Sequence, residues 1–142
     1  MWKKIAVDIF MTIFLALSFI RWDDDATFHY IVGTACAIFF ALHICIHWKW
    51  IKAVTKSCLK GKLKKSLTWK YIVDMLLLAM WSISIATGIL AIGSFSFDIE
   101  WMAIFGRIHG VTARIGLVLV IIHIIQHWQQ IVSYVVRKKK TT

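Results

Sequence analysis

Two stretches of twenty residues decide the fold: HYIVGTACAIFFALHICIHW at residues 29–48 and HGVTARIGLVLVIIHIIQHW at residues 109–128. Each begins with a histidine, has a second histidine fourteen residues later and a third after four more, and ends in tryptophan. Together they contain all six histidines of the chain. A segment that only needed to be apolar would not reproduce this spacing. The chain therefore contains an internal repeat with an offset of 80 residues.

The composition around this repeat is that of an integral membrane protein. Of the 142 residues, 60% are hydrophobic and none is proline, a profile outside the range of soluble domains of similar length. Four apolar segments approach or exceed the ~20 residues that a helix needs to cross a bilayer. We therefore predict an all-α fold in one transmembrane domain over 1–142, with helices at about 5–21, 27–50, 70–95 and 107–136.

The first and third apolar segments also match each other. Lys4 and Asp8 at the start of the first recur as Lys70 and Asp74 at the start of the third. The first segment is therefore predicted to be a retained helix rather than a cleaved signal sequence. These matches predict a four-helix bundle built from a duplicated two-helix unit. Since one helix separates them, the second and fourth helices run in the same direction.

Charges indicate the orientation in the membrane. The net charge is +10, and lysines crowd the connection over 49–70, whereas acidic residues lie at 23–25, 98 and 100 in the other two connections. The positive-inside rule then puts both termini and the lysine-rich loop in the cytoplasm. We expect anionic lipid headgroups to be the partner of this loop, in preference to an acidic protein, and we predict no nucleic-acid partner.

The repeat places the histidines in pairs at equal depth. The pairs are His29 with His109 near the outer face, His43 with His123 toward the inner face, and His47 with His127 at the inner interface. Two imidazoles at one depth on parallel helices can hold a haem b, with one axial nitrogen from each side. No CxxCH motif is present, so such a haem would be held by its ligands alone.

Spacing selects between the two inner candidates. Fourteen residues rise ~21 Å, most of the ~30 Å thickness of the hydrocarbon. In a left-handed bundle with ~3.5 residues per turn, fourteen residues make four whole turns, whereas eighteen overshoot five turns by roughly 50°. The spacing from His29 therefore favours His43 over His47 as the inner ligand.

With these histidines in place, the chain resembles the four-helix, di-haem membrane cytochromes b. That superfamily and its structural relatives include cytochrome b of the bc complexes, the cytochrome b subunits of hydrogenases and formate dehydrogenases, and superoxide oxidase. The chain is also similar to a group of small bacterial membrane proteins whose repeats read K-x-x-x-D, then T-G, then H-x13-H-x3-H-W. Lys70 with Asp74, the pair Thr87 and Gly88, and both histidine helices fit this pattern.

The resemblance covers nearly the whole chain and implies two low-spin haem b groups. It also implies electron transfer in a bacterial inner (cytoplasmic) membrane, to or from a quinone. Because the chain has no soluble domain, the activities of larger relatives do not carry over, and we expect a redox partner protein. Whether it is an electron-transfer subunit, a quinone oxidoreductase or a superoxide oxidase stays open.

Further polar residues are candidates for the site. Asp74, His47 and His127 are the candidates for a quinone site at the inner edge, where an intramembrane carboxylate is functional by default. His47 and His127 can instead contact a propionate, exchange protons or serve only as interfacial residues. Asp8 and Asp74 can either accept protons from a quinol or anchor a histidine or lysine. Three arginines are candidates for haem propionate contacts: Arg21, Arg107 and Arg114. Four glycines are expected to admit either a porphyrin or a close helix: Gly33, Gly88, Gly110 and Gly116.

The two HxxxH patterns leave a second interpretation open. His43, His47, His123 and His127 would lie at one level on parallel helices. Four imidazoles so placed can hold zinc, iron or copper. The alternative is therefore a membrane protein that binds or transports a metal.

Overall fold

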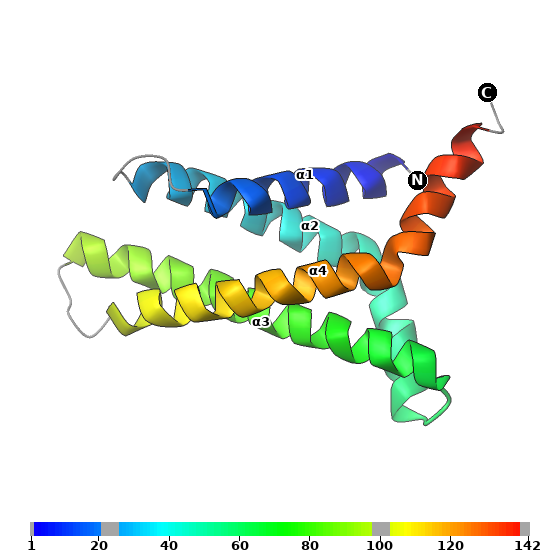
Figure 1. Cartoon of the computed structure of the whole chain (residues 1–142). Coiled ribbons are helices and arrows are strands. Elements are labelled where there is room, and N and C mark those ends of the chain that lie inside the picture. The colour runs from blue at the N-terminus through cyan, green and yellow to red at the C-terminus, as the bar shows by residue number, and fades with distance from the viewer. Residues whose placement is uncertain (1, 21–25, 98–102, 140–142) are drawn as a thin grey trace. The chain divides into compact units, whose positions relative to one another are not determined.

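The computed structural model describes residues 2–20, 26–97 and 103–139. The acidic connections predicted at 21–25 and 98–102 lie outside these ranges. The described residues form four helices, α1 (Trp2–Ser18), α2 (Ala26–Leu59), α3 (Lys65–Phe97) and α4 (Ala103–Lys139), shown in Figure 1. The predicted all-α class is confirmed.

Three of these helices are long and apolar enough to span a membrane. The qualifying segments are Ala26–Leu59, Lys65–Ile92 and Ala103–Ser133. Their large apolar side chains are widely exposed, among them Ile31, Ile89 and Ile125 at 65 to 68%. A helix that is apolar on its exposed side fits a lipid environment. With 17 residues, α1 is ~26 Å long, near the lower limit for a membrane helix.

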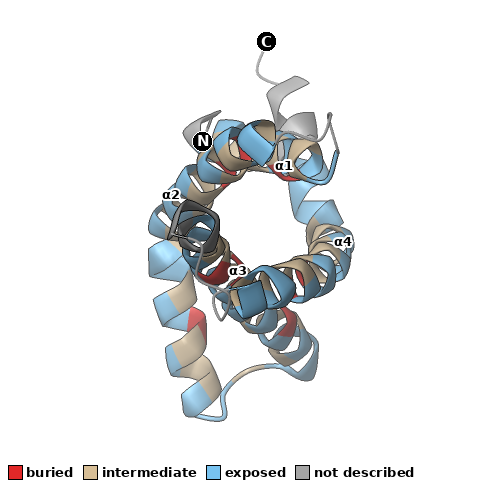
Figure 2. Cartoon of the chain, turned by 90° about the vertical axis from the view of Figure 1, so that its left-hand side faces the viewer, coloured by how far each residue is buried: buried red, intermediate tan, exposed pale blue. Residues whose placement is uncertain are grey.

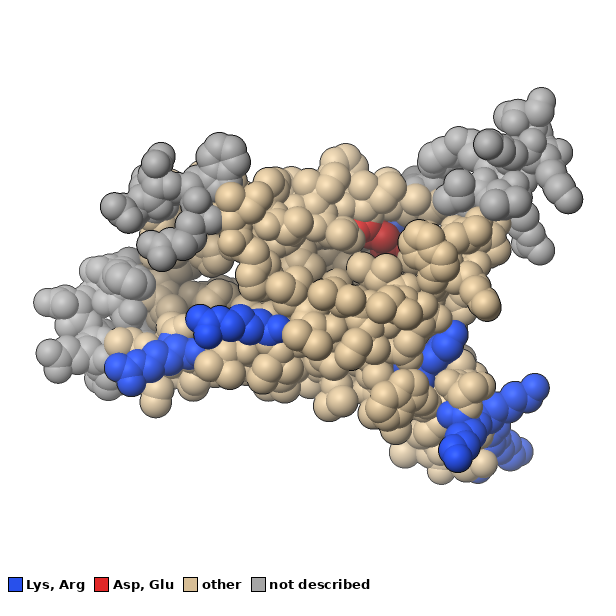
Figure 3. All heavy atoms as spheres, viewed as in Figure 1, with Lys and Arg blue, Asp and Glu red and all other residues tan. Residues whose placement is uncertain are grey.

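The second helix extends beyond the predicted end at residue 50 and continues to Leu59. Its 34 residues would span ~51 Å, well over the ~30 Å of hydrocarbon. The extension is amphipathic, because Lys52 and Lys56 are exposed while Val54 is buried. The helix ends before Gly61, whose φ of 65° is the left-handed conformation common just after a helix. Basic side chains surround this connection on the surface (Figure 3).

The chain divides into two compact units, Met1–Lys60 and Gly61–Thr142. Each is a helical hairpin, with α1 packed on α2 and α3 packed on α4 (Figure 1). Few residues in either hairpin are fully buried (Figure 2). The duplicated two-helix unit predicted from the sequence is therefore present as two helical hairpins.

Packing is duplicated along with the sequence. Residues 41–50 of α2 and 121–130 of α4 show the same pattern of half-buried and exposed positions. The two units differ in side-chain size at one core contact, and the difference on one helix is balanced by an opposite difference on its neighbour. A Cβ added to Gly116 would lie 3.3 Å from Nε1 of Trp81, and the equivalent residues of the first unit are Cys36 and Leu15, both buried. A larger residue on one helix is thus matched by a smaller one on its neighbour.

Candidate functional site

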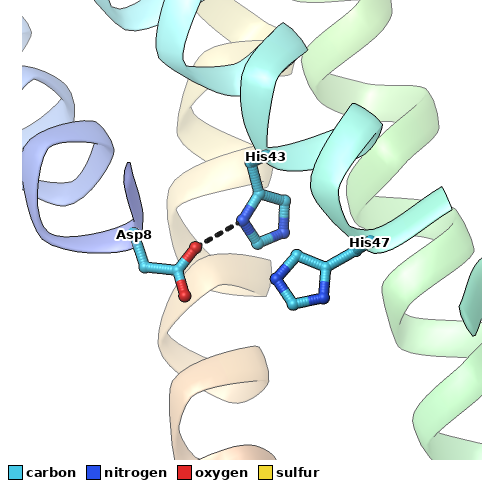
Figure 4. A group of neighbouring side chains, drawn as sticks. All are labelled: Asp8, His43 and His47. Carbon is cyan, nitrogen blue, oxygen red and sulfur yellow. Dashed lines mark hydrogen bonds and ion pairs between the residues drawn. The ribbon is translucent and has the colours of Figure 1, made fainter. Parts of the chain in front are cut away.

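In the first unit a carboxylate and two imidazoles meet between α1 and α2. His43 and His47 lie one turn apart on α2, with ring centroids separated by 4.6 Å. Nδ1 of His43 donates a hydrogen bond to Oδ1 of Asp8 over 2.7 Å. Figure 4 shows the carboxylate facing both rings. One ligand atom from each residue can be chosen so that the three lie within 4.8 Å of one another.

The second unit contains the same cluster between α3 and α4. Nδ1 of His123 donates to Oδ1 of Asp74 over 2.7 Å, and Nε2 of His127 bonds to Oδ2 over 3.3 Å. The two rings are again separated by 4.6 Å between centroids. These three residues also have ligand atoms within 4.8 Å. The repeat in the sequence therefore places an aspartate and two histidines in the same arrangement in both units.

The two clusters differ in enclosure. The side chain of Asp74 is 9% exposed, whereas that of Asp8 is 44% exposed. Nδ1 of His127 has a further partner in Oε1 of Gln130, at 3.1 Å. The equivalent of Gln130 in the first unit is Trp50. The carboxylate of the second cluster is therefore the more enclosed of the two, whereas the His123 ring, at 30% exposed, is less enclosed than the His43 ring, at 20%.

The K-x-x-x-D motif joins the two helices of the second unit. Nζ of Lys70 donates to the carbonyl oxygen of Gln126 over 2.8 Å, and Asp74, one turn later, accepts from the histidines of α4. In the first unit Asp8 likewise accepts from α2. The sequence left open whether these aspartates accept protons or anchor a histidine, and the described contacts are those of anchors.

The outer histidines are bonded through Nδ1 to backbone carbonyls. Nδ1 of His29 donates to the carbonyl oxygen of Ser18 over 3.1 Å. Nδ1 of His109 donates to the carbonyl oxygen of Ser84 over 2.8 Å. Neither serine was predicted from the sequence, although the two share the 66-residue offset of Asp8 and Asp74. That shared offset was the signal that could have found them.

All four histidines of the fourteen-residue spacing are thus bonded through Nδ1 to the first helix of their own unit. A neutral imidazole carries its proton on one nitrogen, so a proton on Nδ1 makes Nε2 the nitrogen with a lone pair. Histidines that bind metals commonly donate their other N–H to a carboxylate or a backbone carbonyl. The arrangement is therefore suited to coordination through Nε2.

Glycine is required beside one of these rings. A Cβ added to Gly88 would lie 2.9 Å from Nδ1 of His109, closer than side chains normally approach. Gly88 and Gly116 therefore serve close packing within the second unit. By contrast, a Cβ added to Gly33 or Gly110 meets no atom within 4 Å. These two glycines leave open backbone near His29 and His109, as a flat cofactor would require.

Two of the candidate arginines, Arg107 and Arg114, lie on α4 with exposed side chains, and Arg21 lies outside the described residues. Seven residues separate Arg107 from Arg114, so they share a face of the helix, and Arg114 lies ~140° around the helix from His109. Their contact with a propionate stays a prediction.

No protein-family model matches the chain, and no curated protein or solved structure matches it.

Proposed function

We propose that this protein is a b-type di-haem cytochrome that carries electrons in a bacterial cytoplasmic membrane, with both termini inside. The observation that carries the proposal is the common bonding of four histidines. Each of them donates from Nδ1 to the neighbouring helix of its own unit. That bond fixes the tautomer and the orientation that an axial ligand needs.

The proposal assigns two imidazoles to each haem. His29 and His109 would hold the outer haem, and His43 and His123 the inner haem; this pairing is taken from the sequence register alone. Because both axial positions would be filled by protein, each iron would supply one-electron transfer and would have no open position for a substrate. The protein would contribute four imidazoles whose orientations are fixed, each with Nε2 available as the ligand atom.

Other features of the two units fit haem. The open backbone at Gly33 and Gly110 offers room for a flat ring, and the exposed side chains of the spans are largely apolar. Arg107 and Arg114 are the cations proposed to meet propionates. A quinone is the proposed membrane partner, at the polar edge formed by His127 and its partners, and a redox protein is the proposed soluble partner.

A reduced-minus-oxidised spectrum of the purified protein tests this proposal. We expect the bands of low-spin haem b, unchanged by carbon monoxide because no axial position is open. Metal analysis of the same sample provides the control. A protein that contains metal but no haem, or that contains neither, would contradict the proposal.

A second candidate function is supported by the two clusters themselves. Each brings a carboxylate and two imidazoles within 4.8 Å, and two histidines with an acidic residue are a common donor set for zinc and for non-haem iron. In the haem assignment the carboxylate orients a histidine through a hydrogen bond, whereas in the metal assignment the carboxylate is itself a ligand. A metal bound through Nδ1 of His123 and Oδ1 of Asp74 would replace their hydrogen bond, so Asp74→Asn should remove the metal. Haem binding through Nε2 should survive the same change.

A further inference from the structure

We propose that His127 and Asp74 bind a divalent metal ion of the zinc type beside the ring of His123. This inference goes beyond the proposed function, in which His127 is not a ligand, and it does not require haem to be present. It also differs from the second candidate function, because the metal takes Nε2 of His127 and Oδ2 of Asp74. The other carboxylate oxygen, Oδ1, keeps its 2.7 Å hydrogen bond to His123.

Oxygen atoms face both ring nitrogens of His127. Nε2 lies 3.3 Å from Oδ2 of Asp74, and Nδ1 lies 3.1 Å from Oε1 of Gln130. A neutral imidazole has one N–H, so it can donate to only one of these two oxygens. When Nδ1 donates to Gln130, the lone pair of Nε2 is directed at a carboxylate oxygen. A cation between these two atoms would replace their repulsion by two bonds.

The separation of these two atoms fits a shared metal ion. Zinc binds imidazole nitrogen and carboxylate oxygen at ~2.0–2.1 Å in tetrahedral geometry, so two such ligand atoms lie about 3.3 Å apart. The distance from Nε2 of His127 to Oδ2 of Asp74 is 3.3 Å. Hydrogen bonds from nitrogen to a carboxylate are shorter, at ~2.7–2.9 Å, as the bond from His123 to the same carboxylate is. The two atoms therefore already have the spacing of two ligands to one ion.

The surroundings of the pair also favour a metal. Histidines that bind metals commonly donate their other N–H to an oxygen acceptor, and Oε1 of Gln130 is placed to accept from Nδ1 of His127. The side chains of His127 and Asp74 are only 14% and 9% exposed, and the attraction between an anion and a cation is stronger where water is largely excluded. An imidazole with a carboxylate suits zinc, and water can fill the two remaining positions.

The ion would join the two helices of the second unit. Asp74 lies on α3 and His127 lies on α4, so each helix contributes one ligand. A ligand that binds the folded protein and not the unfolded chain stabilises the fold. We therefore expect Zn²⁺ to raise the temperature of thermal unfolding, and the rise should depend on His127.

Equilibrium dialysis of the full-length, untagged protein against Zn²⁺, followed by metal analysis, tests the inference. All samples carry His47→Ala, which removes the equivalent histidine of the first unit, so that one site is counted. We expect one zinc per chain in this parent, and both the zinc and the thermal shift should be lost when His127→Ala is added. Gln130→Ala should weaken zinc binding by about tenfold or more. Gln130→Glu keeps an oxygen acceptor and should retain the binding.

His123→Ala separates this site from the three-residue site of the second candidate function. It should keep the zinc, because His123 is not a ligand here, and loss of the zinc would overturn the inference. Zinc retained in His127→Ala would overturn it too. A parent that binds no zinc would do the same, with a proton in place of the metal on Nε2 of His127. Haem content is measured on the same samples, and absence of haem from the parent would overturn the proposed function and leave this inference intact.

Discussion

Replacing Gly88 by alanine should destabilise the second unit and displace the ring of His109. The new Cβ would lie 2.9 Å from Nδ1 and 3.1 Å from Cε1 of that ring, so the ring must move by about 0.5 Å to reach ordinary contact. The ring is held by the 2.8 Å bond to the carbonyl of Ser84. Overpacking costs about 1–3 kcal/mol and a weakened hydrogen bond about 1 kcal/mol, against about 1 kcal/mol gained in helix propensity. The net loss is about 2 kcal/mol.

Gly106→Ala is the matched control on α4. Its Cβ would lie 4.0 Å from that of Ala91, an ordinary contact, so the change should stabilise the protein by about 1 kcal/mol through helix propensity. The free energies of unfolding of the two variants, from denaturant titrations in detergent, should therefore differ by about 3 kcal/mol. Gly88→Ala should also lose the outer haem. Equal stabilities, with the haem content unchanged, would refute this account of Gly88.

Four further predictions concern the histidines, the second cluster and the topology. His43→Ala should lose one haem while His47→Ala keeps both, as haem extraction would show; the opposite result would reverse the ligand assignment. Asp74→Asn should slow haem reduction by quinol without changing haem content, and an unchanged rate in stopped-flow measurements would count against a quinone site there. Lys70→Met should lower the free energy of unfolding by about 1 kcal/mol by removing one hydrogen bond between α3 and α4. A variant with Cys58 as its only cysteine should react with a membrane-impermeant maleimide in inside-out vesicles and not in right-side-out ones, and the reverse would contradict the topology.

Sequence periodicity predicted which residues are equivalent but not which atoms meet. The repeated spacing identified His43 and His123 as equivalent, and the structure gives them the same bond to the same kind of residue. The partners of the outer histidines could not be predicted in the same way. A backbone carbonyl has no signature in a sequence, and its position depends on how the neighbouring helix faces the ring.

The helix bounds show a second limit of the sequence. The apolar pattern ends near residue 50, where the lysines begin, so the prediction ended the helix there. The structure continues it to Leu59, because nothing in the intervening residues breaks a helix before Gly61. The apolar pattern shows where a helix becomes polar, whereas its end is set by backbone conformation.

The amount of haem bound by each chain tests the central claim most directly. Pyridine haemochrome assay of the purified protein, against protein quantified by amino-acid analysis, should give two haem b per chain. A sample with zinc, copper or non-haem iron and no haem would contradict the claim.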